Sequence, residues 1–508
     1  MSKTSSRPDR AKVLATRKER KKLQKELRQR QAESGVVPRP HKMIANHTSE
    51  YKDVDEERLA RNEAVLEQAK IFRAQLPTLL RRLKMIKDPR NPKSSKHKLT
   101  VLMLYGILSF VFQMSSRREA NREMTRPMFV ENLQSLFPDM ESIPHHDTLM
   151  RLLTRIEVNE LGSAHVEVLK RFIRNKKFYR YLIDGHYPIA IDGSQKFAHN
   201  TPIAEQCLHR EIGTKDGTCF QYYVYVLEAN LAFSNGMSIP LMSEFLSNEQ
   251  GDSALTKQDC ELKAFGRLAA RLKKEFPRLP ILVLLDGLYP NGPLMALCQK
   301  YNWQFMIVLQ DGSLKSVWEE VDGLGKLQTG NKASKQWGER QQQFRWVNGI
   351  VYYYGPNDSK SVTINVVICV ETWEEIHKQT NELIVKTSKH AWISSLALTK
   401  GNLHERCNLG ARHRWGIESG FLVEKHHGYH YEKCLAHNWN AMRGYHYLMR
   451  IGHMFNVLAQ YAEHLVKLVK TLGVRGMINF IRATIAAPWL DMRIILQELS
   501  TPYQIRLL

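Results

Sequence analysis

The eight residues PILVLLDG (280–287) predict the centre of the fold. A short, continuous apolar run of this kind predicts a strand that is buried on both of its faces. Such strands are typical of the middle of an α/β sheet. In these sheets ligands gather at the carboxyl ends of the strands, so Asp286, at the end of the run, is expected to face a crevice.

Strand and helix patterns alternate around this central strand. Three segments rich in β-formers precede it: PIAIDGSQ (188–195), CFQYYVYVLEAN (219–230) and MSIPLMSEFL (237–246). They are followed by a helix with one apolar stripe, made of Leu262, Phe265, Leu268, Ala269, Leu272 and Phe276. After the central strand, YPNGP opens a second helix to about Tyr301, and QFMIVLQ (304–310) is another strand. This order predicts an α/β core with an antiparallel start and a parallel finish.

The chain is strongly basic. Its 508 residues include 74 Lys and Arg against 51 Asp and Glu, a formal net charge of +23. This excess favours a polyanionic partner, with nucleic acid first and an anionic membrane surface second. A membrane span needs about 18 apolar residues, and the longest candidate, residues 99–112, is shorter and is therefore expected to be a buried helix. The N-terminus lacks a signal peptide and the 7 cysteines form no C-x-x-C pair, so we expect a cytoplasmic chain on nucleoid DNA.

The regions outside the core have their own patterns. Residues 1–50 are expected to be a basic, flexible or marginally helical arm with a proline-containing linker at residues 34–42; the first 30 residues hold 12 Lys and Arg against 3 acids. Residues 51–177 predict a helical DNA-binding region, in which Asp147 caps a helix. Residues 178–310 are the first part of the core, 311–390 a β-rich insertion, and 391–430 a return strand and a last core helix. Residues 431–508 are helical, with an amphipathic stretch at 445–469.

Carboxylates at the ends of predicted strands are the candidate catalytic groups. Asp192 in IAIDG and Asp286 in VLLDG each follow an apolar strand and precede a glycine. Each aspartate alone is weak evidence for a catalytic site, because Asp-Gly is an ordinary turn dipeptide. Asp184 in YLIDG is the alternative to Asp192. Glu418, on a helix after the insertion, would complete a set of three. Three neighbouring carboxylates repel one another unless cations compensate, and Mg²⁺, or Mn²⁺, does so through oxygen ligands.

The stretch RHRWGIES (412–419) surrounds Glu418 with positive charge. On a helix, Arg414 lies one turn before Glu418 and Lys425 two turns after it on the same side. One helix face would then present a metal ligand between two phosphate-binding cations, with Arg412 close by. The simpler alternative is an exposed salt bridge on a surface helix. Metal-bound carboxylates in a basic protein predict cutting and joining of DNA.

Taken together, IAIDG, LLDGLY and RHRWGIESGFLVEKHHG resemble the signature elements of bacterial insertion-sequence transposases of the DDE type. The resemblance is to the group with a Tyr-x2-Arg-x3-Glu-x6-Lys motif, and it spans about residues 77–460. Arg414, Glu418 and Lys425 match the Arg, Glu and Lys of that motif, whereas Ala411 stands at the Tyr position. In the second motif, Tyr289 follows the aspartate as in the family.

This resemblance implies an RNase H-like core with a β-strand insertion, flanked by helical regions. It implies a transposase that binds the ends of its mobile element in double-stranded DNA as a homodimer and uses Mg²⁺ or Mn²⁺. Trp346 in the insertion is a candidate for stacking on an unpaired base, and a core position is its alternative. A two-metal nuclease and a non-catalytic DNA-binding protein of the same fold are the alternative functions. The implied catalytic metal ligands are Asp192, Asp286 and Glu418, and the implied DNA contacts are Arg414, Lys425, Tyr289, Trp346 and Arg412.

Overall fold

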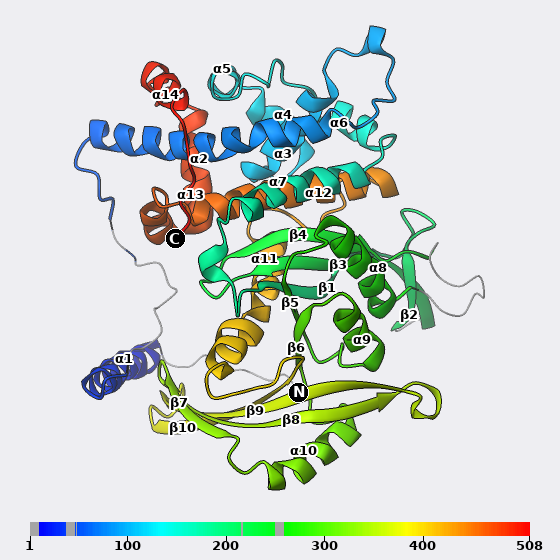
Figure 1. Ribbon diagram of the computed structural model, residues 1–508. Coiled ribbons are helices and arrows are strands. Elements are labelled where there is room, and N and C mark those ends of the chain that lie inside the picture. The colour runs from blue at the N-terminus through cyan, green and yellow to red at the C-terminus, as the bar shows by residue number, and fades with distance from the viewer. Residues whose placement is uncertain (1–9, 37–45, 47, 215–216, 249–258) are drawn as a thin grey trace. The chain divides into compact units, whose positions relative to one another are not determined.

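The computed structural model describes the chain apart from residues 1–9, 37–45, 47, 215–216 and 249–258 (Figure 1). The described chain divides into two compact units. The smaller unit contains helix α1 (Arg10–Glu33) together with Asp286–Cys298 and Gln304–Cys407, and the larger unit contains the rest. Most of the expected linker, from residue 37 to residue 42, lies outside the described residues.

The sheet of the larger unit is built from β1 (Tyr187–His199), β2 (Leu208–Thr214), β3 (Gly217–Ala232), β4 (Ser238–Phe245) and β5 (Ile281–Leu285). Strands β1, β2 and β4 pair with β3 in antiparallel fashion, whereas β5 pairs with β1 in parallel. All of β5 is buried, as its apolar run predicts. The sequence did not predict β2, because this segment, LHREIGT, has two adjacent charged residues near its middle and lacks a run of β-formers.

Strand β1 is longer than expected. Its parallel pairing with β5 ends at Ala190, opposite Leu284, but its antiparallel pairing with β3 continues to His199. Asp192 therefore lies within a strand, and the prediction of a strand end and glycine turn there is wrong. The neighbouring Gly193 serves close packing instead, since a Cβ at this position would lie 2.7 Å from Glu261 Oε1 and even closer to the Tyr225 ring.

Helices cover the sheet of the larger unit. Helix α8 (Glu261–Glu275) buries the predicted stripe except Leu262, which is half exposed. Helices α11 (Trp415–His426) and α12 (Trp439–Gln460) pack on strands, α11 on β1, β3 and β4 and α12 on β4. Residues 445–469 were expected to form one amphipathic helix, but α12 ends at Gln460 and is buried on nearly all sides. The reason is that α12 lies between β4 and the helices α2, α3, α6 and α7 (Figure 1).

The remaining helices of the larger unit lie in the two regions where helices were expected. They are α2 (Val54–Leu83), α3 (Leu99–Val111), α4 (Arg117–Met124), α5 (Pro127–Leu136), α6 (His146–Leu153), α7 (Asn159–Arg174), α13 (Val466–Ile485) and α14 (Met492–Leu499). Helix α3 is buried as predicted. Asp147 is not the cap of α6, because the helix begins one residue earlier and His145 accepts from the Asp147 backbone N–H. In the described part of the chain, no helix combines the length and apolarity that crossing a membrane requires.

The smaller unit contains most of α9 (Gly292–Lys300) and a second set of strands. Strand β6 (Gln304–Val308) pairs with β10 (Leu383–Ser394), which continues to β9 (Lys360–Ile376), β8 (Arg340–Tyr354) and β7 (Lys332–Trp337), all antiparallel. The insertion is thus rich in strands, but it opens with a helix, α10 (Lys315–Leu327), which the sequence analysis missed. The boundary expected at residues 390 and 391 falls inside β10, since this one strand pairs with both β9 and β6.

The basic N-terminal arm contains a helix in the described residues. Helix α1 belongs to the smaller unit, and the Arg30 guanidinium of α1 lies 2.7 Å from the Glu374 carboxylate of β9. Nearer the middle of α1, Arg20 donates to the Lys378 carbonyl, and Glu19 accepts a hydrogen bond from Asn381. These polar contacts connect α1 to β9 and to the turn between β9 and β10.

Candidate active site

Arg414 contacts two of the three predicted carboxylates. Its Nη2 lies 2.7 Å from Glu418 Oε1, and its Nη1 lies 3.5 Å from Asp192 Oδ2. We call these three residues the Arg414 cluster. Asp192 comes from β1, whereas Arg414 ends the short 3-10 helix η6 (Ala411–Arg414) and Glu418 lies in the first turn of α11. Residues from distant parts of the sequence therefore meet at one guanidinium.

The Arg414 cluster is buried on one side and open on the other. The side chain of Arg414 is 8% exposed and that of Asp192 17%, but that of Glu418 is 47% exposed. Among the described residues, Arg414 Nε and Nη1 have no hydrogen-bond partner. The expected i,i+4 ion pair is present, but the arginine is buried and also reaches β1, unlike a surface salt bridge. Buried donors without partners are rare, and each calls for an explanation such as a missing ion or ligand.

Helix α11 approaches the sheet closely because its inner face is made of glycine. A Cβ on Gly416 would lie 3.4 Å from Ala232 Cβ, and one on Gly420 would lie 3.2 Å from Asn230 Nδ2. Glu424 continues this face, since residues four apart lie on the same side of a helix. The spacing Gly416, Gly420, Glu424 thus places the helix axis near β3 and β4, and Glu418 projects from another side of the helix.

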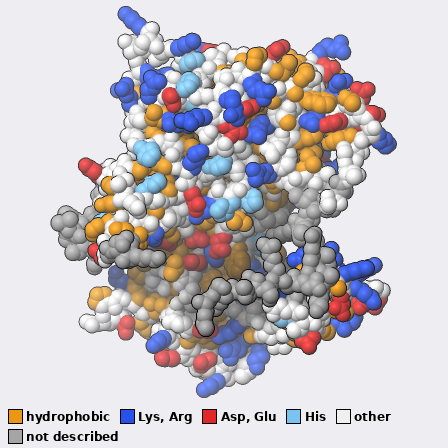
Figure 2. All heavy atoms as spheres, turned by 180° about the vertical axis from the view of Figure 1, so that it is seen from behind, with side chains coloured by type: hydrophobic (Ala, Val, Ile, Leu, Met, Phe, Trp, Pro, Cys, Tyr) orange, Lys and Arg blue, Asp and Glu red, His pale blue; other side chains and the backbone are white. Residues whose placement is uncertain are grey.

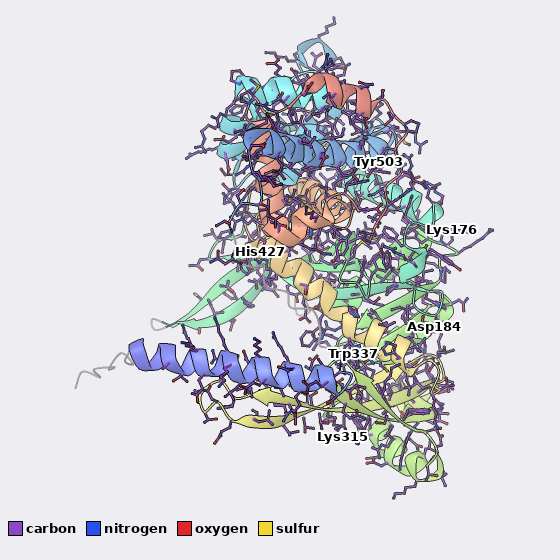
Figure 3. All side chains as sticks on the ribbon, turned by 90° about the vertical axis from the view of Figure 1, so that its left-hand side faces the viewer. Lys176, Asp184, Lys315, Trp337, His427 and Tyr503 are labelled. Atoms are coloured by element: carbon purple, nitrogen blue, oxygen red, sulfur yellow. The ribbon has the colours of Figure 1, made fainter. Side chains whose placement is uncertain are left out.

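Asp286 and Asp184 are held in turns. Asp286 directly follows β5 and is the first residue of its segment in the smaller unit; its Oδ1 accepts from the Leu288 backbone N–H at 2.9 Å. Asp184 lies in the turn before β1 (Figure 3), with positive φ angles at Asp184 and Gly185 and a two-residue bridge between Ile183 and His186. Asp184 is therefore a tight-turn residue, whereas Asp192 is the aspartate that contacts Arg414.

The other two predicted cations lie on either side of the Arg414 cluster in the sequence. Arg412 Nε donates to Asn408 Oδ1 at 3.1 Å. Lys425, near the end of α11, lies 3.1 Å from Glu432 and is 22% exposed. Both residues are partly exposed, in contrast to the buried Arg414.

Tyr289 and Trp346 do not offer their rings to a nucleic acid in this structure. Tyr289 is 1% exposed and Trp346 is 4% exposed, within the smaller unit. Trp346 lies in β8 opposite Val367 of β9, so it occupies the core position that was its alternative. In the turn after β5, the backbone N–H of Tyr289 donates to the Asp286 carbonyl. Both residues are therefore core positions in this structure, and their DNA contacts stay predictions.

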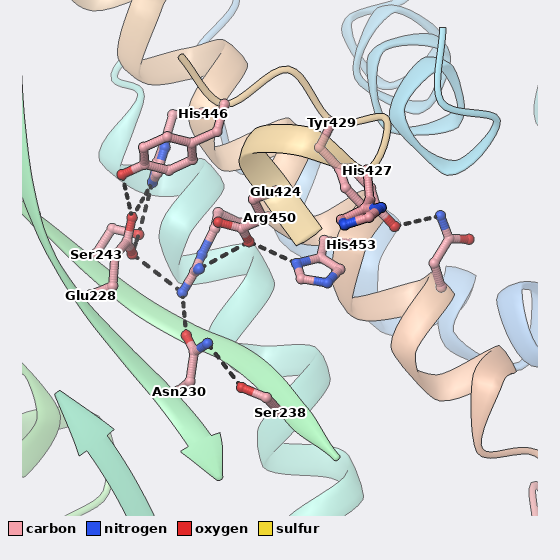
Figure 4. Close-up of polar contacts among 12 residues, drawn as sticks. Glu228, Asn230, Ser238, Ser243, Glu424, His427, Tyr429, His446, Arg450 and His453 are labelled. Atoms are coloured by element: carbon pink, nitrogen blue, oxygen red, sulfur yellow. Dashed lines mark hydrogen bonds and ion pairs between the residues drawn. The ribbon is translucent and has the colours of Figure 1, made fainter. Parts of the chain in front are cut away.

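A second arginine joins a strand to α11 deeper in the larger unit. Arg450 of α12 lies 3.0 Å from Glu424 of α11 and 3.2 Å from Glu228 of β3 (Figure 4). We call Glu228, Glu424 and Arg450 the Arg450 cluster. All three side chains are at most 1% exposed. Glu228 lies directly opposite Asp192 in the β1–β3 ladder, so the two strand acids are cross-strand neighbours on the same face of the sheet.

Further polar groups surround the Arg450 cluster. Ser243 donates to Glu228 at 2.6 Å, and the His453 ring lies 2.7 Å from Glu424. Burial would raise the pKa of both glutamates, but Arg450 and the neighbouring histidines outweigh it and hold each pKa below its ordinary value. Burial also lowers the pKa of Lys196, whose ammonium donates to the Tyr431 carbonyl, to about 8. The two buried glutamates are therefore ionised at neutral pH.

The sequence analysis missed the Arg450 cluster. Its signal was a single arginine in the apolar stretch YHYLMRIGHMF, with histidines four residues before and three residues after it. A charge in an apolar helix requires a buried partner. The spacing of Gly416, Gly420 and Glu424 in α11 indicates the helix face that meets the sheet. It could therefore have identified Glu424 as one of those partners.

The donor chemistry of the Arg414 cluster fits a hard divalent cation. Asp192 and Glu418 would supply carboxylate oxygens, and Mg²⁺ commonly takes one or two carboxylates together with water and substrate phosphates. Across the residues that the structure describes, no group of three or more His, Cys, Asp or Glu side chains is close enough to hold a metal. In the arrangement observed, the cation between the two carboxylates is the Arg414 guanidinium.

The chain matches one family model, described as DDE_Tnp_1-associated, over residues 80–168. The matched segment runs from the end of α2 into α7 and covers less than a fifth of the chain; Asp192, Asp286 and Glu418 lie outside it. A comparison with curated proteins gave no match. The matched segment points to a DDE-type transposase family.

Proposed function

We propose that the chain is a DDE transposase of the Tyr-Arg-Glu-Lys group, which binds the ends of its mobile element and cuts and joins DNA strands with the help of divalent metal. The observation that carries the proposal is the meeting of Asp192 and Glu418 at Arg414. The match to the transposase-associated family over residues 80–168 supports it independently. The mixed α/β sheet with flanking helices is compatible with an RNase H-like core.

Three carboxylates act as metal ligands in this proposal. Asp192 and Glu418 enter it from their shared contact with Arg414. Asp286 enters it from its position directly after β5, the strand that pairs in parallel with β1, and from the family resemblance. When Mg²⁺ or Mn²⁺ is bound, it supplies a Lewis acid that polarises the scissile phosphate and lowers the pKa of the attacking water. The protein's part is to hold the carboxylate oxygens at a fixed geometry.

Arg414, Arg412 and Lys425 contact substrate phosphates in this proposal. Guanidinium groups suit phosphate because their planar donors bind two oxygens at once. The partner is double-stranded DNA, both at the element ends and at the target, and the protein acts as a homodimer so that two ends are held together. The net charge of +23 supports this partner. Figure 2 shows Lys and Arg side chains over the upper part of one face of the larger unit, mixed with acidic ones.

The experiment is strand cleavage and joining on duplexes that carry the two ends of the DNA element encoding the chain, with Mg²⁺. Wild type is compared with Asp192→Asn, Asp286→Asn and Glu418→Gln, which preserve shape and remove charge. We expect each to lose cleavage by at least 100-fold, on the scale of lost transition-state charge stabilisation, and to keep end binding. Asp184→Asn is the matched control, because this aspartate lies in a turn before β1, and it should cleave like wild type.

Each alternative function has its own outcome. Cleavage without joining would favour a two-metal nuclease. End binding by wild type without any cleavage would favour a non-catalytic DNA-binding protein. Loss of cleavage in Asp184→Asn, with Asp192→Asn active, would transfer the role of first ligand to Asp184.

A further inference from the structure

The guanidinium of Arg414 occupies the place between two carboxylates where the proposed function requires a divalent cation. It lies 2.7 Å from Glu418 and 3.5 Å from Asp192, so the oxygens that would bind a metal face this guanidinium instead. A guanidinium and a divalent ion repel each other and compete for the same carboxylate oxygens. The two cations therefore exclude each other from the cluster unless Arg414 moves.

Arg414 also has donors to offer elsewhere. Its Nε and Nη1 have no hydrogen-bond partner among the described residues, although the side chain is 8% exposed. A phosphate group provides several acceptor oxygens that match the planar donors of a guanidinium. Glu418, at 47% exposed, keeps one side of the cluster open to such a group.

We propose that Arg414 is a positioning residue that holds Asp192 and Glu418 together in the metal-free protein and releases them when its guanidinium turns to a DNA phosphate. Metal binding and DNA binding are then coupled through one side chain. This inference rests on the proposed function, because it assumes that Asp192 and Glu418 bind metal. It adds that Arg414 opposes metal binding in the absence of DNA. The site then binds metal mainly in the DNA complex.

The coupling has a required symmetry. If DNA raises the affinity for metal, then metal must raise the affinity for DNA by the same factor, and such couplings are typically about 5- to 150-fold. An arginine that only braced the two carboxylates would have the opposite signature, because its removal would loosen the site and weaken metal binding.

The test is a titration of the full chain with Mn²⁺, in which free Mn²⁺ is measured by electron paramagnetic resonance, with and without a DNA duplex. We expect Arg414→Gln to bind Mn²⁺ about 5-fold or more tightly than wild type without DNA, at the lower end of measured couplings. We expect DNA to tighten Mn²⁺ binding to wild type by a similar factor and to leave the variant unchanged. Arg58→Gln is the control for lost charge, since Arg58 forms an exposed ion pair on α2, and it should behave like wild type.

The outcomes separate this inference from the proposed function. Equal or weaker Mn²⁺ binding by Arg414→Gln without DNA would overturn the inference and leave the metal site intact. If Asp192→Asn and Glu418→Gln bound Mn²⁺ like wild type, the metal site itself would be refuted. Should Arg414→Gln fail to fold, Arg414→Lys gives the same test, because an ammonium lacks the planar donors that span two carboxylates. Tighter Mn²⁺ binding by this variant supports the inference, and unchanged binding overturns it.

Discussion

Two arginines in the larger unit each lie between one strand acid and one acid of α11, but in different surroundings. Arg450 lies between a strand acid, Glu228, and an acid of α11, Glu424. Arg414 lies between Asp192 of the neighbouring strand and Glu418 of the same helix. The Arg450 cluster is fully buried and surrounded by further polar partners, whereas the Arg414 cluster has one half-exposed acid and two guanidinium nitrogens without hydrogen-bond partners among the described residues.

This difference separates an ion cluster that is closed on all sides from one that is open on one side. A buried charge that loses its partner is left in a medium of low dielectric, so the Arg450 cluster cannot open without unfolding its surroundings. An exposed acid can exchange one cation for another at little cost in free energy. The Arg450 cluster holds α11 against the sheet. The Arg414 cluster depends on this position, because Glu418 lies on the same helix.

The comparison predicts unequal losses of stability when each arginine is removed. Arg450→Met should lower the free energy of unfolding by about 3–5 kcal/mol, because it leaves two buried glutamates without their cation. Arg414→Gln should lower it by about 1 kcal/mol at most, since Glu418 is half exposed and solvent screens its charge. Urea denaturation followed by tryptophan fluorescence measures both. Equal losses would show that the two clusters do not differ as described.

A glycine next to Asp192 tests the packing beneath the open cluster. Gly193→Ala should lower the free energy of unfolding by about 1–3 kcal/mol, because the new Cβ overlaps the Tyr225 ring and approaches Glu261 Oε1. Gly213→Ala in β2 is the matched control, since nothing lies within 4 Å of a Cβ there, and its stability should stay within about 0.5 kcal/mol of wild type. A stable Gly193→Ala would mean that β1 can shift around Asp192.

Acid should weaken the Arg450 cluster through Glu424. The pKa of Glu424 is lower in the folded protein than its ordinary value of 4.5, so its contribution to stability is present above that value and is lost as the pH falls below it. Glu424→Gln should be less stable at neutral pH but should lose stability less steeply below pH 4.5, by at most about 1.4 kcal/mol per pH unit for one proton. Thermal unfolding at pH 3 to 7 measures the slope. An unchanged slope in Glu424→Gln would show that this carboxylate does not account for stability lost in acid.

The smallest effect on stability is expected at Lys425. Its ion pair with Glu432 is partly exposed, so Lys425→Gln should change the free energy of unfolding by less than about 0.5 kcal/mol. If Lys425 contacts a phosphate, the slope of log affinity for DNA against log salt should fall by about one. Fluorescence anisotropy at several salt concentrations gives that slope. An unchanged slope would remove Lys425 from the DNA contacts.

The sequence predicted the elements whose formation depends on residues close together in the chain. The apolar runs of α3, β5 and β6 and the turn before α9 were all read correctly. The extent of β1 was not, because β3 sets it through pairing far along the chain. The burial of α12 on nearly all sides was missed for the same reason, since it depends on helices hundreds of residues earlier.

The candidate site divides in the same way. Two sequence patterns identified candidate residues: the spacing of Arg414, Glu418 and Lys425, and the apolar run before Asp192. Of these residues, the structure brings Asp192 and Glu418 to the guanidinium of Arg414. The position of Arg414 between the two acids could not be predicted, because it depends on how closely α11 approaches β1. The burial of Trp346 and Tyr289 could not be predicted, because aromatic side chains look alike in a sequence whether they are buried or exposed.

The position of Arg450 on α12 also sets the order in which the protein can be made. Arg450 is synthesised 220 residues after Asn230, one of the groups to which it donates, which corresponds to roughly 10–45 s on the ribosome at about 5–20 residues per second. For most of that interval Asp192 has been made but Glu418 has not, and α11 stays without its contact to Arg450 until the interval ends. A nascent chain therefore cannot assemble the Arg414 cluster until α11 has been made, and it cannot fasten α11 through Arg450 until α12 has followed.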